Sequence, residues 1–325
     1  MSQVTLPMDS IARPAAPTVR TTREPAGPNA ATDRFYRRVL RELRAAGVEV
    51  LVGGGYALER YLGIGRLVKD LDLFLRPEDV AKALEHLGRR VHCATELTFP
   101  HWLAKIRKRG DHVDFIFNGG NGITAVDDDW FNYAVPSMVL DEPVSLCPVE
   151  EMIWSKAFVM ERERYDGADV AHLLHACAGT LDWDRLTRRF GRHWRVLFAH
   201  LTLFGFIYPS ERRRIPEAVV RRCQSLLEQE MKNAPARRVC RGTLTSRAQY
   251  LVDLELWGYE DARLAPYGSM TEEDTSIWTA AIDKDASRPL GERPRDTAAP
   301  DSVANASEDA SREGASSSSA AVERR

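Results

Sequence analysis

The sequence predicts an α+β fold, in which a mixed β-sheet with flanking helices is followed by a helical C-terminal domain and enclosed by two disordered tails. Three observations carry this prediction. Strand and helix patterns alternate from residue 33 to about residue 148, the later patterns are nearly all helical, and both ends of the chain lack apolar periodicity. We therefore expect a tail at 1–30, a sheet-containing core at 31–148, a helical domain at 149–283 and a second tail at 284–325.

Composition and charge set the first limits on function. The 325 residues are 44% hydrophobic and 28% charged, and the net charge of −2 neither favours nor opposes a polyanionic partner. The sequence contains no run of about 18 apolar residues, so we expect no membrane span. Residues 1–30 contain no apolar signal segment. Five cysteines without a C-x-x-C pair indicate reduced thiols, so we expect a cytoplasmic protein without a membrane partner.

The elements of the core follow from apolar spacing. Phe35, Val39 and Leu43 recur at helical spacing, and the helix should end at Ala46-Gly47. A short apolar run at 48–52 predicts a buried strand that feeds a glycine turn. The other expected elements are a helix at 56–62, a strand at 71–75, a helix at 77–89 with proline in its first position, and a strand at 112–117.

The second half of the chain has mostly helical patterns and no repeat of fixed period. The predicted helices span 149–164, 168–178, 183–190, 194–206 and 216–231.

Acidic residues within apolar strands are the first functional signal. Asp70 and Asp72 stand two positions apart on a predicted strand, so both side chains point to the same face. Strand interiors disfavour aspartate, and two carboxylates on one face repel each other unless a cation lies between them. Asp114 is a third carboxylate within a second apolar strand. If the two strands are neighbours, the three aspartates could hold two Mg²⁺ ions, an arrangement suited to in-line displacement at phosphorus.

A glycine turn precedes the acidic strand. Gly53 and Gly54 follow a predicted strand and open a helix, where backbone N–H groups can hold a phosphate. The segment lacks the G-x-x-x-x-G-K-[ST] pattern of a P-loop. Taken alone, the pair of glycines is explained better by ordinary turn chemistry than by phosphate binding.

The combination of these features resembles the nucleotidyltransferase superfamily, of which DNA polymerase beta is the familiar member. The likeness is greatest to small bacterial nucleotidyltransferases, including the toxins of type IV toxin–antitoxin systems. Their motif has two glycines, a small residue, Ala-Leu, and then Arg-x-[Ser/Thr]-x-Asp-[Leu/Ile]-Asp. The matching residues here are Gly53, Gly54, Ala57, Leu58, Arg66, Asp70 and Asp72.

The resemblance implies roles for particular residues. It assigns metal binding and catalysis to Asp70, Asp72 and Asp114, with a two-metal Mg²⁺ site. A second block, from Pro148 to Lys156 and on to Asp166 and Asp169, is similar to the family's later Lys-and-Asp segment. Lys156 would then contact the nucleotide phosphates and take part in catalysis. The nucleotide-binding set implied in full is Gly53, Gly54, Arg66, Lys69, Lys156, Asp166 and Asp169.

The implied activity is Mg²⁺-dependent transfer of a nucleoside monophosphate from an NTP to a hydroxyl acceptor. The acceptor can be tRNA, a protein or a small molecule, and a toxin-like role would add an antitoxin partner. One departure from the motif keeps an alternative open: Val68 stands where many relatives have serine or threonine. Because a lost hydroxyl can remove a phosphate contact, the chain could instead be an inactive nucleotide-binding or regulatory protein with the same fold.

Ordinary structural explanations compete with these assignments. Asp70 and Asp72 could be solvated charges of an edge strand, and Lys156 could lie on an exposed helix face. His172 and His175, three residues apart, are explained better by packing than by metal binding. Between Asp182 and Arg247 there are 15 basic and 6 acidic residues, an excess that fits tRNA binding and a solvated helix surface equally well.

Overall fold

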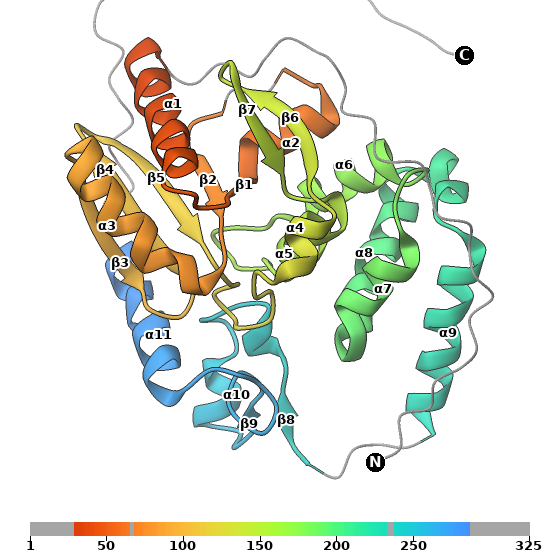
Figure 1. Ribbon diagram of the computed structural model, residues 1–325. Helices are drawn as coiled ribbons and strands as arrows, with labels where there is room; N and C mark the ends of the chain where they lie inside the picture. The colour runs from red at the N-terminus through yellow and green to blue at the C-terminus, as the bar shows by residue number, and fades with distance from the viewer. Residues whose placement is uncertain (1–28, 66–67, 233–236, 287–325) are drawn as a thin grey trace, which may run out of the picture. The chain divides into compact units, whose positions relative to one another are not determined.

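The computed structural model describes residues 29–65, 68–232 and 237–286 (Figure 1). Nearly all of the two predicted tails, and Arg66 of the predicted nucleotide-binding set, lie outside these residues. A seven-stranded sheet forms the centre of the described part, with the strand order β3-β4-β5-β2-β1-β7-β6. Its strands are β1 (Leu51–Val52), β2 (Leu71–Phe74), β3 (Ala94–Phe99), β4 (Leu103–Lys108), β5 (Asp111–Ile116), β6 (Val135–Val139) and β7 (Glu142–Leu146).

The sheet is mixed, which confirms the predicted fold class. Strand β2 runs parallel to β5, and β1 runs parallel to β7. The pairs β1–β2, β3–β4, β4–β5 and β6–β7 are antiparallel. The three strands expected from the sequence are β1, β2 and β5, and β1 is shorter than the predicted run at 48–52.

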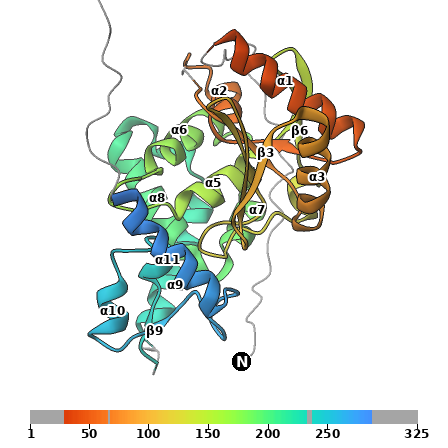
Figure 2. The same cartoon turned by 90° about the vertical axis from the view of Figure 1, so that its left-hand side faces the viewer.

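Helices cover both faces of the sheet. Helices α1 (Ala30–Ala45) and α3 (Val80–Val91) pack against each other, and Figure 2 shows them on one face. Helix α2 (Gly54–Leu62) packs against β2 and α6. Two short helices complete this half of the chain: the 3-10 helix η1 (Pro77–Asp79), which leads into α3, and α4 (Asp128–Asn132).

The chain after β7 is mostly helical, as expected. Its first helices are α5 (Val149–Ala157), α6 (Gly167–Cys177), α7 (Trp183–Phe190), α8 (Trp194–Ile207) and α9 (Glu217–Met231), with the 3-10 helices η2 (Gly191–His193) and η3 (Pro209–Arg214) between them. The predicted helix at 149–164 was too long. The chain leaves α5 after Ala157 and turns back on itself, so that Met160 forms a bridge with Tyr165.

The last described elements are less regular. They are β8 (Val239–Cys240), the 3-10 helix η4 (Gly242–Leu244), α10 (Leu251–Glu255), β9 (Glu260–Asp261) and α11 (Glu272–Ala286). Strands β8 and β9 pair in parallel as a separate two-stranded sheet, which the helical patterns did not predict. The described residues up to Asp285 belong to one compact unit, and the domain boundary at residue 148 stays a prediction.

The alternation of side chains on β2 and β5 places the functional residues. Leu71, Leu73, Val113 and Phe115 are fully buried in the hydrophobic core. Asp72 lies between the two leucines of β2, so its side chain points to the opposite face of the sheet. Within the described ranges, no helix combines the length and apolar character needed to cross a membrane.

Candidate active site

One cavity of about 680 Å³ lies over this polar face of the sheet. Three stretches of chain form its walls. The first comes from α2, β2, β5 and the loop after β5, the second from α5 to α6, and the third from the segment around η4 together with α11. The lining residues that the sequence had singled out are Gly54, Leu58, Val68, Lys69, Asp70, Asp72, Asp114, Lys156, Asp166 and Asp169.

The glycine turn lies directly against an aspartate. The N–H of Gly53 donates to the backbone oxygen of Asp72 at 2.9 Å. Gly54 has φ +49, and a Cβ at this position would lie 1.6 Å from an Asp72 carboxylate oxygen. Both the backbone conformation and the lack of space therefore require glycine at position 54. The N-terminus of α2 is in this way brought next to the carboxylate.

Two of the aspartates face each other across neighbouring strands. Asp72 and Asp114 are partners in the parallel β2–β5 register, as the sequence argument required. Asp70 lies just before β2, and its side chain is 52% exposed, with His112 Nε2 3.5 Å from its Oδ1. The two motif aspartates therefore differ in environment, although they lie only two residues apart.

Asp72 has no direct partner of opposite charge among the described residues. Removal from water raises its pKa to about 7, and the carboxylates of Asp114 and Asp70 act in the same direction against the opposing charges of Lys156 and Arg164. Its carboxylate has no hydrogen bond or ion pair with any described residue. A carboxylate held in this way suits a cation that arrives with the substrate.

The donor set fits magnesium in part. Asp70 and Asp72 offer the carboxylate oxygens that Mg²⁺ prefers, and Mg²⁺ commonly uses one or two carboxylates together with substrate phosphates. In the described part of the chain, however, no three His, Cys, Asp or Glu side chains are grouped to hold a metal ion. The three aspartates therefore do not form one closed set of ligands.

Lys156 lies on the second wall of the cavity. Its ammonium bonds Asp166 at 2.9 Å and Asp169 at 2.8 Å. Burial alone would raise the pKa of Asp166, but hydrogen bonds and charge from Arg164 and Lys156 hold it below its ordinary value. The acidic residues of the second motif block thus orient Lys156, which is 13% exposed and points away from bulk solvent.

The third wall contains residues that the sequence did not identify. Trp278 of α11 packs in an edge-to-face arrangement on Trp102, with ring centroids 5.0 Å apart. A Cβ at Gly120 would lie 2.4 Å from the Trp278 ring, so the indole closes directly over the backbone there. Asn121 Nδ2 donates to Leu244 O at 2.6 Å and joins the loop after β5 to η4. No residue spacing in the sequence pointed to these contacts.

Some predicted residues lie elsewhere. Gly53 is adjacent to the cavity but does not line it. His175 packs on Tyr208, with ring centroids 4.9 Å apart, and neither His172 nor His175 lines the cavity.

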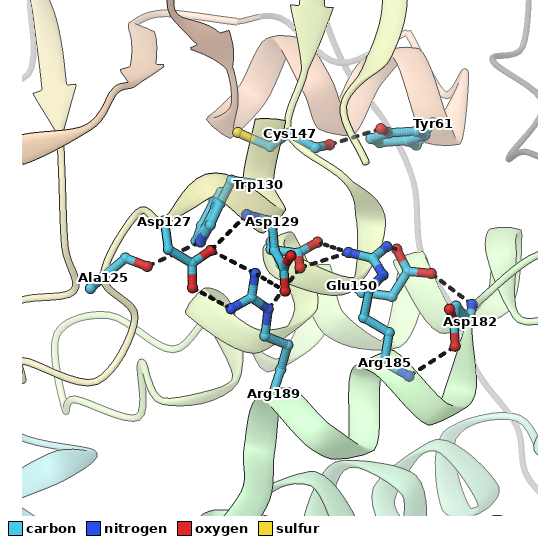
Figure 3. A network of polar contacts seen from close by, with 11 residues as sticks. Tyr61, Ala125, Asp127, Asp129, Trp130, Cys147, Glu150, Asp182, Arg185 and Arg189 are labelled. Carbon is cyan, nitrogen blue, oxygen red and sulfur yellow. Dashed lines mark hydrogen bonds and ion pairs between the residues drawn. The ribbon is translucent and has the colours of Figure 1, made fainter. Parts of the chain in front are cut away.

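Part of the arginine-rich stretch is occupied by an internal ion-pair network. Arg185 of α7 bonds both Glu150 and Glu151 of α5, and its side chain is 6% exposed. Arg189 bonds Glu151 at 2.9 Å and Asp127 at 2.6 Å (Figure 3). These two arginines hold helices together, so their charge is not available to a polyanion. The local basic excess is therefore smaller at the surface than the sequence suggests.

Comparison with known proteins gives a family match for part of the chain. Residues 32–190 match a family model described as nucleotidyl transferase of unknown function (DUF2204). None of the curated proteins matches the sequence.

Several solved structures are similar at low identity. The antibiotic-resistance factor ANT(2'')-Ia matches with 16% identity and a TM-score of 0.36 over 52% of this chain and 96% of its own. An antigenic nucleotidyltransferase-like protein from Paracoccidioides brasiliensis matches with 12% identity and a TM-score of 0.37 over 56% and 91%. A tRNA-processing enzyme matches with 13% identity and a TM-score of 0.30 over 63% and 66%. These values are too low to transfer a substrate to this chain. The family model assigns residues 32–190, about half of the chain, to the nucleotidyltransferases.

Proposed function

We propose that the protein is a Mg²⁺-dependent nucleotidyltransferase that moves a nucleoside monophosphate from an NTP to an acceptor hydroxyl. One observation supports this most directly. The same cavity is lined by Gly54 at the start of α2, by Asp70, Asp72 and Asp114, and by Lys156. These residues come from three separate parts of the chain, and together they offer the backbone donors, carboxylates and cation that phosphoryl chemistry needs.

The cavity suits a triphosphate at the start of α2. The first N–H groups of a helix are free to bind an anion, and the helix dipole favours negative charge there. Glycine at position 54 allows the Asp72 carboxylate to lie directly beside that end of the helix, where it can hold a cation next to the phosphates. Lys156 faces the same space and would offset charge that builds on the leaving pyrophosphate, while Asp166 and Asp169 hold its ammonium in place.

The reaction forms one bond and breaks one bond. The acceptor oxygen attacks the α-phosphorus, the bond from that phosphorus to the oxygen bridging to the β-phosphate breaks, and pyrophosphate leaves with the electron pair. The hydroxyl proton passes to solvent or to a carboxylate of the cavity. Mg²⁺ bound by Asp70 and Asp72 would compensate the phosphate charge. The residues themselves bind, orient and shield the reacting groups.

The acceptor is expected to approach from the third wall. Because Trp102 and Trp278 lie at that wall and the start of α2 lies at the first, the cavity offers separate places for the triphosphate and for a second molecule. A tRNA, a protein side chain or a small molecule remains a candidate. A tRNA would have to use arginines other than Arg185 and Arg189. A toxin-like role with an antitoxin partner is a further expectation within this proposal.

Incorporation of label tests the proposal. Purified protein is incubated with each α-³²P-labelled NTP, Mg²⁺ and a cell lysate that is then separated into RNA, protein and small molecules. Label should enter one fraction, with release of pyrophosphate, and the Asp72→Asn variant should give none. Absence of label from every fraction with every NTP would contradict the proposal.

A second candidate function is nucleotide binding without turnover. Val68 favours it, because its side chain is 3% exposed and covers Gly55, where a Cβ would lie 2.8 Å from Val68 Cγ1. An apolar group therefore lies at the cavity wall where relatives offer a hydroxyl. Binding of NTP without any release of pyrophosphate would support this function over transfer.

A further inference from the structure

Four residues form a row across four neighbouring strands. Glu96 pairs with Lys105 between β3 and β4, Lys105 pairs with Asp114 between β4 and β5, and Asp114 pairs with Asp72 between β5 and β2. Residues directly opposite each other on adjacent strands project to the same face of a sheet. The row therefore places one lysine next to Asp114, on the side away from Asp72.

Lys105 engages both oxygens of Asp114. Its ammonium lies 2.8 Å from Oδ1 and 3.0 Å from Oδ2, and the two side chains are only 19% and 18% exposed. Glu96 does not compete for this ammonium, because it pairs with Arg107 at 3.3 Å. His112 is a second neighbour of Asp114, with Nε2 3.9 Å from Oδ1. Asp114 is thus charge-compensated from within the protein.

Asp70 and Asp72 are not compensated in the same way. Asp70 Oδ1 lies 3.5 Å from His112 Nε2, a longer contact than that between Lys105 and Asp114, and Asp72 has no ion pair with any described residue. The three acidic residues therefore divide into two that are open to an incoming cation and one that already has a fixed ammonium. A bidentate, charge-assisted contact of this kind has to be broken before Asp114 can bind a metal with both oxygens.

We propose that the Lys105 ammonium replaces the second metal ion, so that the nucleotide-bound protein takes up a single divalent cation at Asp70 and Asp72. Lys105 acts here as a positioning residue that fixes and neutralises Asp114. This inference rests on the proposed function, because it describes the metal requirement of the same site. It replaces the two-metal arrangement that the sequence resemblance implies.

The opposing explanation is that Lys105 and Asp114 are an ordinary cross-strand ion pair. Such a pair contributes modestly to sheet stability and has no effect on metal binding. The two explanations differ in the number of ions bound, which a structural role would not change.

The number of Mn²⁺ ions bound per protein molecule distinguishes the two explanations of the Lys105–Asp114 pair. Protein is saturated with each α,β-methylene NTP in turn, and bound Mn²⁺ is counted by equilibrium dialysis and electron paramagnetic resonance. We expect one ion in the wild type and two in Lys105→Met, where the second ion binds about 10- to 100-fold more tightly than in the wild type. Lys105→Arg keeps the charge and should return the count to one. Lys105→Met combined with Asp114→Asn should also bind one.

The outcomes distinguish the two levels of proposal. Two ions in the wild type, or one in Lys105→Met, would overturn the role of Lys105 and leave the proposed function standing. Failure of every analogue and of Mn²⁺ to bind the wild type would overturn the proposed function and the inference with it. Lys108→Met on the same strand is the control for folding, because its ammonium bonds the backbone oxygen of Val91 and not an aspartate.

Discussion

Charged residues gather in two regions of this protein, and the two groups differ in how their charges are matched. In the α5–α7 network, Arg185 and Arg189 face Glu150, Glu151 and Asp127, and the charged groups that are most buried have partners of opposite sign. In the cavity, Asp72 lies beside Asp114 and Asp70, and its pKa is raised to about 7 because it is removed from water next to like charges. A fold is destabilised when one partner of a matched buried pair is removed, whereas unmatched charge at a cavity indicates a place for a substrate or a cation.

The largest effect is expected when the unmatched acid is removed. Asp72→Asn should lower nucleotidyl transfer on the order of 10³-fold or more, because an anionic group at the reacting centre becomes neutral. The fold should be at least as stable as the wild type, since repulsion between neighbouring carboxylates is relieved. Transfer rate and thermal midpoint are measured together, with Asp141→Asn as the exposed control. Wild-type transfer by Asp72→Asn would exclude the residue from catalysis.

Removal of a matched buried charge should destabilise the fold, in contrast to the removal of Asp72. Arg185→Met leaves Glu150 and Glu151 buried without their cation and should cost about 3–5 kcal/mol of unfolding free energy in urea. The matched control is Arg195→Met, whose pair with Glu230 is about half exposed and should cost no more than about 1 kcal/mol. Equal losses in the two variants would show that the network is not the stabilising element we describe.

Lys156 belongs to both categories, because its charge is matched and it also lines the cavity. Lys156→Met should weaken NTP binding by about 1–3 kcal/mol, the value of a charge-assisted contact. Isothermal titration with an α,β-methylene NTP measures this, and Lys232→Met at an exposed position of the α9 end is the control. An unchanged affinity in Lys156→Met would mean that the ammonium serves only Asp166 and Asp169.

The smallest effect is expected at Val68. Val68→Thr adds a hydroxyl to the cavity wall with little change in volume, and it should change NTP affinity by no more than about tenfold, the value of one hydrogen bond. A tighter affinity together with faster release of pyrophosphate would show that valine limits turnover. A fold destabilised without a change in affinity would show that the hydroxyl does not reach the phosphates.

The sequence predicted the elements whose patterns are regular. Strands β2 and β5 and helices α6 to α9 were predicted because their apolar residues keep a clear period. The turn at Gly53-Gly54 was predicted because its backbone conformation and lack of space require glycine at position 54. Strand β4 was missed because Lys105, Arg107 and Lys108 interrupt its apolar run. Strand β3 was missed because it is largely exposed at the sheet edge.

The site was only partly predictable for the same reason. The aspartates are recognised from their position within apolar strands, which is a local signal. The contact between Trp278 and Gly120, and the pairing of Lys105 with Asp114, depend on which parts of the chain the fold brings together. No local spacing in the sequence predicts the contact of Trp278 with Gly120. The pairing of Lys105 with Asp114 can be predicted only when the strand register is known.

The ion-pair network also fixes how far α5 is turned about its own axis. Glu151 in its first turns is held by α7, while Lys156 near its end is held by Asp169 of α6. Five residues advance a helix by about 140° beyond one full turn, so the two contacts lie on well-separated sides of the cylinder. Insertion or deletion of one residue between them would rotate Lys156 by about 100° relative to Glu151. The segment from Glu151 to Lys156 should therefore tolerate changes of residue type far better than changes of length.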